Sequence, residues 1–388
     1  MASQLTEILK KFNKECNSDV FTQGIAVNSC QRIPFTSPRA NSMLYGGLPR
    51  GRVVEFCGAE GSGKTTTAFD IVANAQALFR QEWEDEIAQL ENKEKLNKTE
   101  TAHLASLREL GPKKVMWIDV ENTFDEEWAE TLGVNVHEMY FMSPDKQYAE
   151  QILDMVSDII DTGEVGLAVI DSIAMMLSKQ EFEKSIEEKT YGGIAMAMTR
   201  FSRLIEGKCM RTNCLLIGIN QLRDKIDAAG YGGPTYTTPG GRCWKHACSV
   251  RLLFREGSPF DAKYIKLAKK DPNPYGHFVE ISVLKSKVSK PNRKGGSYTL
   301  TYDEGINALY DLIDLGIQLD VIHKSGAWFT FIIDKESGEI FCRQDEDGNL
   351  EEVKVQGQAN LIPFFMQEKN KDLLDVVTSR VNDYVKGI

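Results

Sequence analysis

Residues 58–65 read Gly-Ala-Glu-Gly-Ser-Gly-Lys-Thr and match the pattern of a phosphate-binding loop. The glycines of such a loop let backbone N–H groups close around phosphate oxygens, while its lysine reaches the terminal phosphates and its hydroxyl holds Mg²⁺. A buried-strand pattern at residues 52–57 leads in, and a helical pattern at residues 66–79 leads out. This order places a helix N-terminus under the phosphates. The sequence therefore predicts a nucleoside triphosphate site with Mg²⁺ as cofactor.

Three short apolar runs after the loop end in polar residues. Residues 115–119 and 167–171 end in aspartate, and residues 214–221 end in Asn220 and Gln221. Apolar runs that alternate with helical segments form a mostly parallel sheet covered by helices on both faces. Ligands bind at the carboxyl ends of such strands, where these polar residues fall. The fold class is therefore expected to be α/β, with a phosphate-binding loop at the sheet's carboxyl edge.

The strand ends supply candidates for hydrolysis, which needs a metal anchor and a group that orients the attacking water. We expect Asp171 to hold Mg²⁺ together with Thr65, and Glu121 to activate water. The alternative for a strand-end carboxylate is a cap or a salt bridge, but two beside a phosphate-binding loop favour catalysis. Gln221 could hydrogen-bond the γ-phosphate. The Gly- and Pro-rich residues 227–241 that follow suit a ligand-dependent switch.

Changes in pattern divide the chain into three parts. Residues 1–40 hold a short amphipathic helix and a linker, which we interpret as an oligomerisation segment because a lone helix packs on a neighbour. Residues 41–304 form the α/β core. Within the core, the densely charged residues 80–112 keep a helical apolar stripe and predict a projecting helical hairpin. Residues 305–388 mix helix and hairpin patterns and predict a small α+β domain.

Charge and hydropathy narrow the function classes. A net charge of −10 argues against nucleic-acid binding by the surface as a whole, so any polyanion site must be local. Basic residues do cluster, although a solvated basic face is the alternative interpretation. The clusters are Lys263, Lys266, Lys269 and Lys270, and Lys285, Lys287, Lys290, Arg293 and Lys294. The sequence has no apolar run of membrane-spanning length and no signal-peptide order at its start, so we expect a cytoplasmic protein that does not contact membranes.

An ordered series of short motifs carries a family resemblance. The motifs are residues 47–52 (Gly-Leu-Pro-Arg-Gly-Arg), 118–121 (Ile-Asp-Val-Glu), 169–172 (Val-Ile-Asp-Ser), 219–226 (Ile-Asn-Gln-Leu-Arg-Asp-Lys-Ile), 249–252 (Ser-Val-Arg-Leu), 285–287 (Lys-Ser-Lys), 303–307 (Asp-Glu-Gly-Ile-Asn) and 325–328 (Ser-Gly-Ala-Trp). With the phosphate-binding loop, they make the chain resemble the bacterial RecA recombinase family over nearly its whole length. The resemblance implies a RecA-like P-loop NTPase core, an N-terminal helix-plus-strand docking segment and a small C-terminal domain.

The resemblance also implies roles for individual residues at an ATP site. Glu121 resembles the family's catalytic glutamate and Gln221 its γ-phosphate sensor, while Lys285 and Lys287 match a pair that reaches the γ-phosphate bound to a neighbouring subunit. The adenine would be framed by Asp125, Trp128 and Tyr302, with tryptophan in place of the usual tyrosine. The remaining nucleotide-binding positions are Gly58, Glu60, Gly61, Ser62, Gly63, Lys64, Thr65 and Thr66.

Two loops would bind single-stranded DNA, and they correspond to about residues 184–193 and 223–242. Glycine amides would meet phosphates, arginines would supply charge, and Tyr191 and Ile226 would wedge between bases. The full set of candidate DNA-binding residues is Tyr191, Gly192, Thr199, Arg203, Arg223, Ile226, Gly240, Gly241 and Arg242. Met196 departs from the family, which usually has arginine there, and Arg200 lies one helical turn on.

The implied function is an ATP-dependent filament on single-stranded DNA that pairs it with a homologous duplex and exchanges strands, with DNA-stimulated ATP hydrolysis. The implied partners are both DNAs, other copies of the chain, and loader or mediator proteins. Two alternatives remain open. One is a ring-forming helicase motor of the same fold, which the order of the second loop and the paired lysines disfavours. The other is a passive single-strand-coating protein, for which Lys64, Glu121 and Asp171 together would be superfluous.

Overall fold

The computed structural model describes residues 4–15, 30–184, 192–224, 236–334, 337–344 and 349–387. The chain forms two compact units, Met1–Gln31 and Arg32–Ile388. The first contains α1 (Gln4–Glu15), on which Ile8 and Phe12 are about half exposed. Helix α1 confirms the amphipathic helix predicted near the start of the chain. The predicted domain boundaries at residues 40 and 304 stay predictions.

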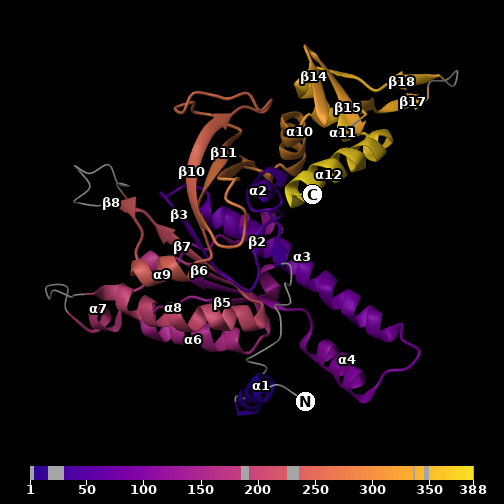
Figure 1. Ribbon diagram of the computed structural model, residues 1–388. Helices are drawn as coiled ribbons and strands as arrows, with labels where there is room; N and C mark the ends of the chain where they lie inside the picture. The colour runs from indigo at the N-terminus through magenta and orange to yellow at the C-terminus, as the bar shows by residue number, and fades with distance from the viewer. Residues whose placement is uncertain are drawn as a thin grey trace. The chain divides into compact units, whose positions relative to one another are not determined.

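A nine-stranded sheet organises the second unit, with the order β13-β12-β11-β10-β3-β7-β6-β4-β5 (Figure 1). The strands from β10 to β5 in this order are parallel, and β10, β11, β12 and β13 pair antiparallel. The mostly parallel sheet predicted from the sequence is therefore confirmed. Its strands are β3 (Val53–Gly58), β4 (Lys114–Asp119), β5 (Met139–Met142), β6 (Val165–Asp171), β7 (Leu215–Gln221), β10 (Val250–Phe260), β11 (Gly276–Ser286), β12 (Gly295–Thr301) and β13 (Gly305–Ile306).

The central strands are apolar on both faces because helices cover both. Val169 and Ile217 belong to a hydrophobic cluster with the inner side of α3 (Lys64–Glu91). Their neighbours Ala168 and Leu216 belong to a second cluster with α6 (Ala149–Asp161) and α8 (Gly193–Thr212). This assignment follows from the strand period of two, which sends successive side chains to opposite faces. The sheet is thereby held between helix layers, and its carboxyl edge stays available for ligands.

Shorter elements connect these layers. They are β1 (Arg32–Ile33), α2 (Pro38–Met43), β2 (Leu48–Pro49), α4 (Lys98–Leu110), α5 (Glu126–Thr131), α7 (Lys179–Glu183), β8 (Arg223–Asp224), β9 (Tyr236–Thr237) and α9 (Gly241–Ala247). Single 3₁₀ turns lie at Val136–Glu138, Ile173–Met175, Gln358–Asn360 and Glu368–Asn370. Among the helices in the described ranges, none is long and apolar enough to cross a membrane.

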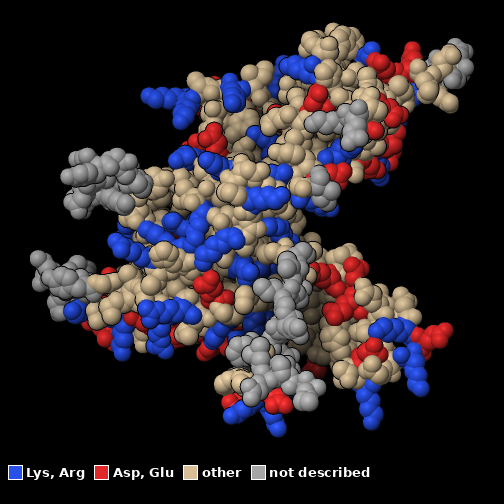
Figure 2. Space-filling view, viewed as in Figure 1, with Lys and Arg blue, Asp and Glu red and all other residues tan. Residues whose placement is uncertain are grey.

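Helix α3 continues past the core and forms a hairpin with α4. The indole Nε1 of Trp83 donates to the carbonyl oxygen of Leu107 at 2.7 Å. Asn97 begins α4 with a capping box shared with Glu100, which satisfies backbone donors at the start of the helix. Figure 2 shows acidic and basic side chains mixed over this hairpin. Mixed charge of this kind is typical of a helix pair that is largely exposed to solvent.

The C-terminal elements have a hydrophobic cluster of their own, which includes Leu312, Phe331 and Val377. The elements are α10 (Ala308–Gln318), β14 (Ile322–Ser325), β15 (Trp328–Asp334), β16 (Glu339–Ile340), β17 (Cys342–Gln344), β18 (Leu350–Glu352), β19 (Val355–Gln356), α11 (Leu361–Phe365) and α12 (Lys371–Lys386). This small α+β arrangement is the one predicted for the end of the chain.

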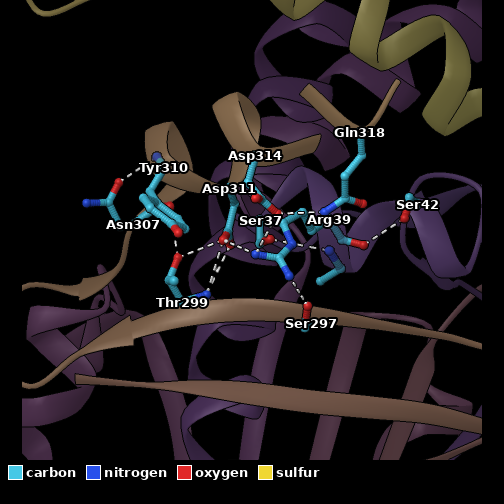
Figure 3. Close-up of polar contacts among 11 residues, drawn as sticks. Ser37, Arg39, Ser42, Ser297, Thr299, Asn307, Tyr310, Asp311, Asp314 and Gln318 are labelled. Carbon is cyan, nitrogen blue, oxygen red and sulfur yellow. Dashed lines mark hydrogen bonds and ion pairs between the residues drawn. The ribbon is translucent and has the colours of Figure 1, made fainter. Parts of the chain in front are cut away.

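A buried polar network joins α10 to the core (Figure 3). The carboxylate of Asp311 is fully buried and accepts hydrogen bonds from the backbone N–H of Thr299 and from its hydroxyl, the latter at 2.6 Å. Arg39 of α2 lies 3.5 Å from Asp311 and 3.1 Å from Asp314. The network therefore ties α2, β12 and α10 together with charge-assisted hydrogen bonds, which are the stronger kind.

Candidate functional site

The phosphate-binding loop connects β3 directly to α3. Gly61 and Gly63 have φ angles of +70° and +87°, a region that favours glycine. A Cβ atom on Gly58 would lie 2.5 Å from Oγ of Ser62 and 2.7 Å from the carbonyl oxygen of Phe254. Helix α3 starts without a side-chain cap, so its first N–H groups are available to an anion. The loop has the shape and the donors of a phosphate cradle.

Lys64 fills the loop from within. Its Nζ donates to the carbonyl oxygen of Ala59 at 2.6 Å and lies 3.5 Å from Oγ of Ser62. Burial lowers the pKa of Lys64, although Asp171 and Glu121 favour its charged form. A buried ammonium held mainly by a neutral carbonyl oxygen gains electrostatic energy when an anion arrives. The predicted role of Lys64 fits a bound triphosphate.

Thr65 and Asp171 are in contact. The hydroxyl of Thr65 donates to Oδ2 of Asp171 at 2.9 Å. Burial raises the pKa of Asp171 to about 7, and the nearby carboxylates of Glu121 and Asp119 add to the rise. A hydroxyl and a carboxylate are oxygen ligands of the kind that Mg²⁺ prefers, and the cation would offset the repulsion among the carboxylates. The predicted metal pair therefore fits Mg²⁺.

Glu121 lies at the centre of a second group of contacts. Its Oε1 accepts hydrogen bonds from Nε2 of Gln221, at 2.9 Å, and from the hydroxyl of Ser172. Strands β4 and β7 lie on either side of β6, so their ends bring Glu121 and Gln221 together. Our sequence reasoning assigned no role to Ser172. Its position directly after Asp171 is the signal that could have identified it.

The residues predicted to frame the adenine, Asp125, Trp128 and Tyr302, lie on two separate segments of the chain. Nε1 of Trp128 lies 3.4 Å from the hydroxyl of Thr66 in the first turn of α3. The carboxylate of Asp125 accepts the backbone N–H of Trp128 at 3.0 Å and caps α5. Tyr302 is about half exposed and shares a hydrogen bond with Nδ1 of His277. The turn that follows Tyr302 approaches α5, because a Cβ atom on Gly305 would lie 2.7 Å from Cδ2 of Leu132, the residue after α5.

The paired lysines of β11 contact other parts of their own chain. Nζ of Lys285 donates to the carbonyl oxygens of Lys245 and His246, at 2.6 and 3.0 Å, at the end of α9. Nζ of Lys287 lies 3.5 Å from Oε1 of Glu206 on α8. No hydrogen bond or ion pair within the described part of the chain joins either lysine to the phosphate-binding loop.

Three glycines of the predicted DNA-binding set lie where α8 and α9 begin. Gly192 precedes α8, and Gly240 and Gly241 start α9 with φ angles of +91° and +76°. A Cβ atom on Gly241 would lie 3.3 Å from Cβ of Ala195, so the two helix starts are neighbours. Two helix N-termini side by side present N–H groups suited to phosphates. Tyr191 and Ile226 lie outside the described residues.

The three arginines of the predicted DNA-binding set lie on α8, β8 and α9. Arg203 and Arg242 are exposed, and Nη2 of Arg223 donates to the carbonyl oxygen of Ala174 at 3.3 Å. Figure 2 shows Lys and Arg side chains gathered over the face around α9, next to β7 and β10. The hydroxyl of Thr199 donates to the carbonyl oxygen of Ala195 at 2.7 Å within α8. A local basic face thus exists on a chain whose net charge is −10.

Comparison with known proteins agrees with this geometry. The model of a family described as RecA N-terminal domain matches residues 1–82 and 86–307. Protein RecA of Campylobacter jejuni subsp. doylei is 34% identical over 294 residues, which cover 76% of this chain and 72% of the relative. Protein RecA of Sulfurimonas denitrificans is 35% identical over 286 residues (74% and 70%), and that of Campylobacter fetus subsp. fetus is 31% identical over 321 residues (81% and 80%).

The chain belongs to the RecA family. Membership makes it an ATP-dependent recombinase and confirms the resemblance seen in the motifs. It also favours this function over the ring helicase and the passive coating protein that the sequence had left open.

One position beside the predicted DNA-binding residues differs from the pattern that the family resemblance implies. Met196, where the family usually has arginine, is 66% exposed in the first turn of α8. Arg200, one turn further along the same helix, is also exposed. Residues four apart lie on one side of a helix, so Arg200 remains a candidate for the missing charge.

Proposed function

We propose that this RecA-family protein is a DNA-dependent ATPase whose complete catalytic site forms only between successive copies of the chain in a filament. The observation that carries the proposal is the division of its charged groups. Lys64, Glu121 and Asp171 gather at one carboxyl edge of the sheet, whereas Lys285 is held at the end of α9. In a single subunit the site therefore lacks the ammonium groups of Lys285 and Lys287. It becomes complete when a neighbouring copy supplies them.

Each residue at the site then has a definite task. Lys64 and the N–H groups of the loop bind the β- and γ-phosphates, and the side chains of Thr65 and Asp171 hold the metal. Bound Mg²⁺ would neutralise the charge on these phosphates. Glu121 accepts a proton from the attacking water, and the hydroxyl of Ser172 fixes the carboxylate for this step. Nε2 of Gln221 donates a hydrogen bond to the same carboxylate and would exchange it for a hydrogen bond to the γ-phosphate.

DNA binding follows from the converging starts of α8 and α9. Glycine N–H groups and the neighbouring arginines would contact phosphates, which bind without reading sequence. Base edges then stay free to pair with a homologous duplex. Strand β7 ends in Gln221, and the chain continues directly into β8 at Arg223. A movement of Gln221 toward the γ-phosphate would therefore shift the chain segment that we propose binds DNA.

ATP turnover with and without single-stranded DNA tests the proposal, together with electron microscopy of the DNA complex. We expect DNA to raise turnover and filaments to form with a slowly hydrolysed ATP analogue. Lys64→Ala should abolish nucleotide-dependent DNA binding, whereas Lys95→Ala, which alters an exposed lysine between α3 and α4, should not. A protein that stays a single particle with ATP, Mg²⁺ and oligonucleotide would refute the proposal.

A further inference from the structure

His277 of β11 overhangs the phosphate-binding loop. Strands β10 and β11 continue past the end of β3, at the sheet edge where the loop begins (Figure 1). Val279 of β11 lies against the loop, because a Cβ atom on Gly63 would lie 3.0 Å from Cγ2 of Val279. His277 is two residues nearer to the start of β11, and at about 3.3 Å per residue it lies about 7 Å beyond Val279. Side chains two residues apart on a strand point to the same face, so His277 shares with Val279 the face that α3 covers.

His277 also anchors the ring of Tyr302. Nδ1 of His277 and the hydroxyl of Tyr302 share a hydrogen bond of 3.1 Å, and the centroids of the two rings are 5.6 Å apart. The two residues differ in exposure, which is 8% for His277 and 45% for Tyr302. A buried side chain of the sheet therefore holds an exposed aromatic ring beside the loop.

A second aromatic ring lies on the segment that faces Tyr302. Nε1 of Trp128 on α5 lies 3.4 Å from the hydroxyl of Thr66 in the first turn of α3. The turn after Tyr302 touches the end of α5, because a Cβ atom on Gly305 would lie 2.7 Å from Leu132. Aromatic faces stack on nucleobases of every kind. The two rings therefore suit the base of a nucleotide whose phosphates occupy the loop.

The other ring nitrogen of His277 is unpaired. Nε2 is buried and has no hydrogen-bond partner among the residues that the structure describes. Burial lowers the pKa of His277, although Glu256 favours its charged form, so the imidazole is neutral at neutral pH. A buried polar atom without a partner destabilises a fold, and an apolar side chain of similar size would avoid this cost. Its contact with Tyr302 is therefore a better explanation for the imidazole than stability is.

We propose that His277 is a positioning residue of the nucleotide site, which holds the ring of Tyr302 for contact with the base of ATP. This inference rests on the proposed function, in which the phosphate-binding loop binds ATP, and it adds a residue that acts on the base through Tyr302. Burial also raises the pKa of Tyr302, so both partners of the hydrogen bond are neutral. A hydrogen bond between neutral groups contributes about three- to tenfold in affinity.

The test compares ATP with inorganic tripolyphosphate, a ligand that offers a chain of phosphates without a base. Each ligand, with Mg²⁺, displaces a fluorescent ATP analogue from the whole chain in the absence of DNA, so affinity is measured without DNA-stimulated hydrolysis. His277→Leu removes the hydrogen bond and keeps an apolar side chain, whereas Tyr302→Phe removes only the hydroxyl. The double variant combines the two changes. His277→Asn is the conservative replacement, because its amide keeps a hydrogen-bonding group near the position of Nδ1.

The matched control is His137→Leu, which alters an exposed histidine in the 3₁₀ turn before β5. The free energy of unfolding of each protein is measured in urea without nucleotide. Because Tyr302→Phe alters a half-exposed side chain, it removes the same hydrogen bond without changing the buried position.

We expect His277→Leu and Tyr302→Phe each to weaken ATP binding about three- to tenfold and to leave tripolyphosphate binding unchanged. The double variant should bind ATP as either single variant does, because both changes remove one contact. His277→Asn should keep most of the wild-type affinity, and His137→Leu should not change it. His277→Leu should be at least as stable as the wild type, because it removes the unpaired Nε2.

Unchanged ATP affinity in His277→Leu and Tyr302→Phe would refute the proposal. An equal loss of tripolyphosphate affinity would also overturn it, because the effect would then lie on the phosphates. A less stable or unfolded His277→Leu protein would show that the imidazole serves the fold, and it would overturn the positioning role too. A wild type that binds neither ligand would contradict the proposed function and this inference with it, whereas equal binding by all variants would count against the inference alone.

Discussion

Nζ of Lys285 on β11 lies 2.6 Å from the carbonyl oxygen of Lys245, at the C-terminal end of α9. A cation at this end of a helix is stabilised by the helix dipole and by the unpaired carbonyl groups. Gly240 and Gly241, which we propose bind DNA, begin the same helix. Lys285 therefore holds the end of α9 in the isolated chain, and under the proposed function it would release α9 before it contacts a phosphate on a neighbouring copy.

The first prediction concerns this exchange. Lys285→Ala should abolish most DNA-stimulated ATP hydrolysis and leave nucleotide binding intact. A mixture of the Lys285→Ala and Lys64→Ala proteins should hydrolyse ATP faster than either protein alone. In a mixed filament, a Lys285→Ala subunit supplies an intact phosphate-binding loop and a neighbouring Lys64→Ala subunit supplies Lys285. The site at the interface between these two subunits is therefore complete. Turnover against mixing ratio measures this, and a mixture no more active than the sum of its parts would exclude action across the interface.

Glu121→Gln should separate ATP binding from hydrolysis. The amide keeps the size of the side chain but cannot accept the proton of the attacking water, so we expect turnover to fall about 100-fold or more. Nucleotide affinity should change little, and the protein should stay on DNA longer. The control is Glu126→Gln, which alters an exposed carboxylate in the first turn of α5. Single-turnover kinetics at varied ATP concentration give the rate constant of hydrolysis and the nucleotide affinity. Rapid hydrolysis by the Glu121→Gln variant would remove Glu121 from the mechanism.

Local patterns were enough to predict which residues lie together at the carboxyl edge of the sheet. The loop glycines, Lys64 and Thr65 are adjacent in the sequence, and strand-end residues such as Asp171 and Glu121 fall at one edge in any parallel sheet. The contact of Ser172 with Glu121 depends on how two separate strands align, which periodicity does not report. The contact of Lys285 with α9 was likewise not predictable, because it depends on how β11 packs against the C-terminal end of α9 in the folded chain.

The hydrogen-bond network around the buried carboxylate of Glu55 was also not predicted. Its carboxylate is fully buried and accepts hydrogen bonds from Asn220, Trp244 and Arg251. In the sequence Glu55 is a single acid in an apolar strand, a position that usually excludes charge. Only the assembled fold shows that the carboxylate has three partners, and that it joins β3, β7, β10 and α9.

Gly240→Ala should weaken single-stranded DNA binding while nucleotide binding is retained. At a φ of +91° an alanine is strained by about 1 to 2 kcal/mol, and its Cβ would lie 3.4 Å from Trp244. The start of α9 would then shift from its contact with α8. Gly207→Ala is the matched control, because Gly207 lies inside α8 with no atom within 4 Å of its added Cβ. That change should stabilise the helix by about 1 kcal/mol. Equal DNA affinities of the two variants would contradict the role of Gly240.

Asp311 should make stability depend on pH in a direction opposite to that of an ordinary ion-paired carboxylate. Burial raises its pKa from 3.8 to about 6, although Arg39 and the hydrogen bonds of Ser37 and Thr299 oppose the rise. A carboxyl group whose pKa is higher in the folded than in the unfolded chain binds its proton more tightly when folded. Its contribution to stability is therefore complete below the unfolded pKa and is lost as the pH rises through the folded value.

The shift corresponds to about 3 kcal/mol, lost between about pH 4 and about pH 6. Asp311→Asn removes this titration, so the free energy of unfolding of the wild type relative to that variant should decrease over the interval and level off above it. Other groups, including Asp70 with its pKa of about 6, titrate in both proteins and cancel in the difference. Urea unfolding of both proteins across this pH range measures the effect. A difference that is constant or that increases with pH would show that Arg39 holds Asp311 ionised throughout, so that the ion pair outweighs burial.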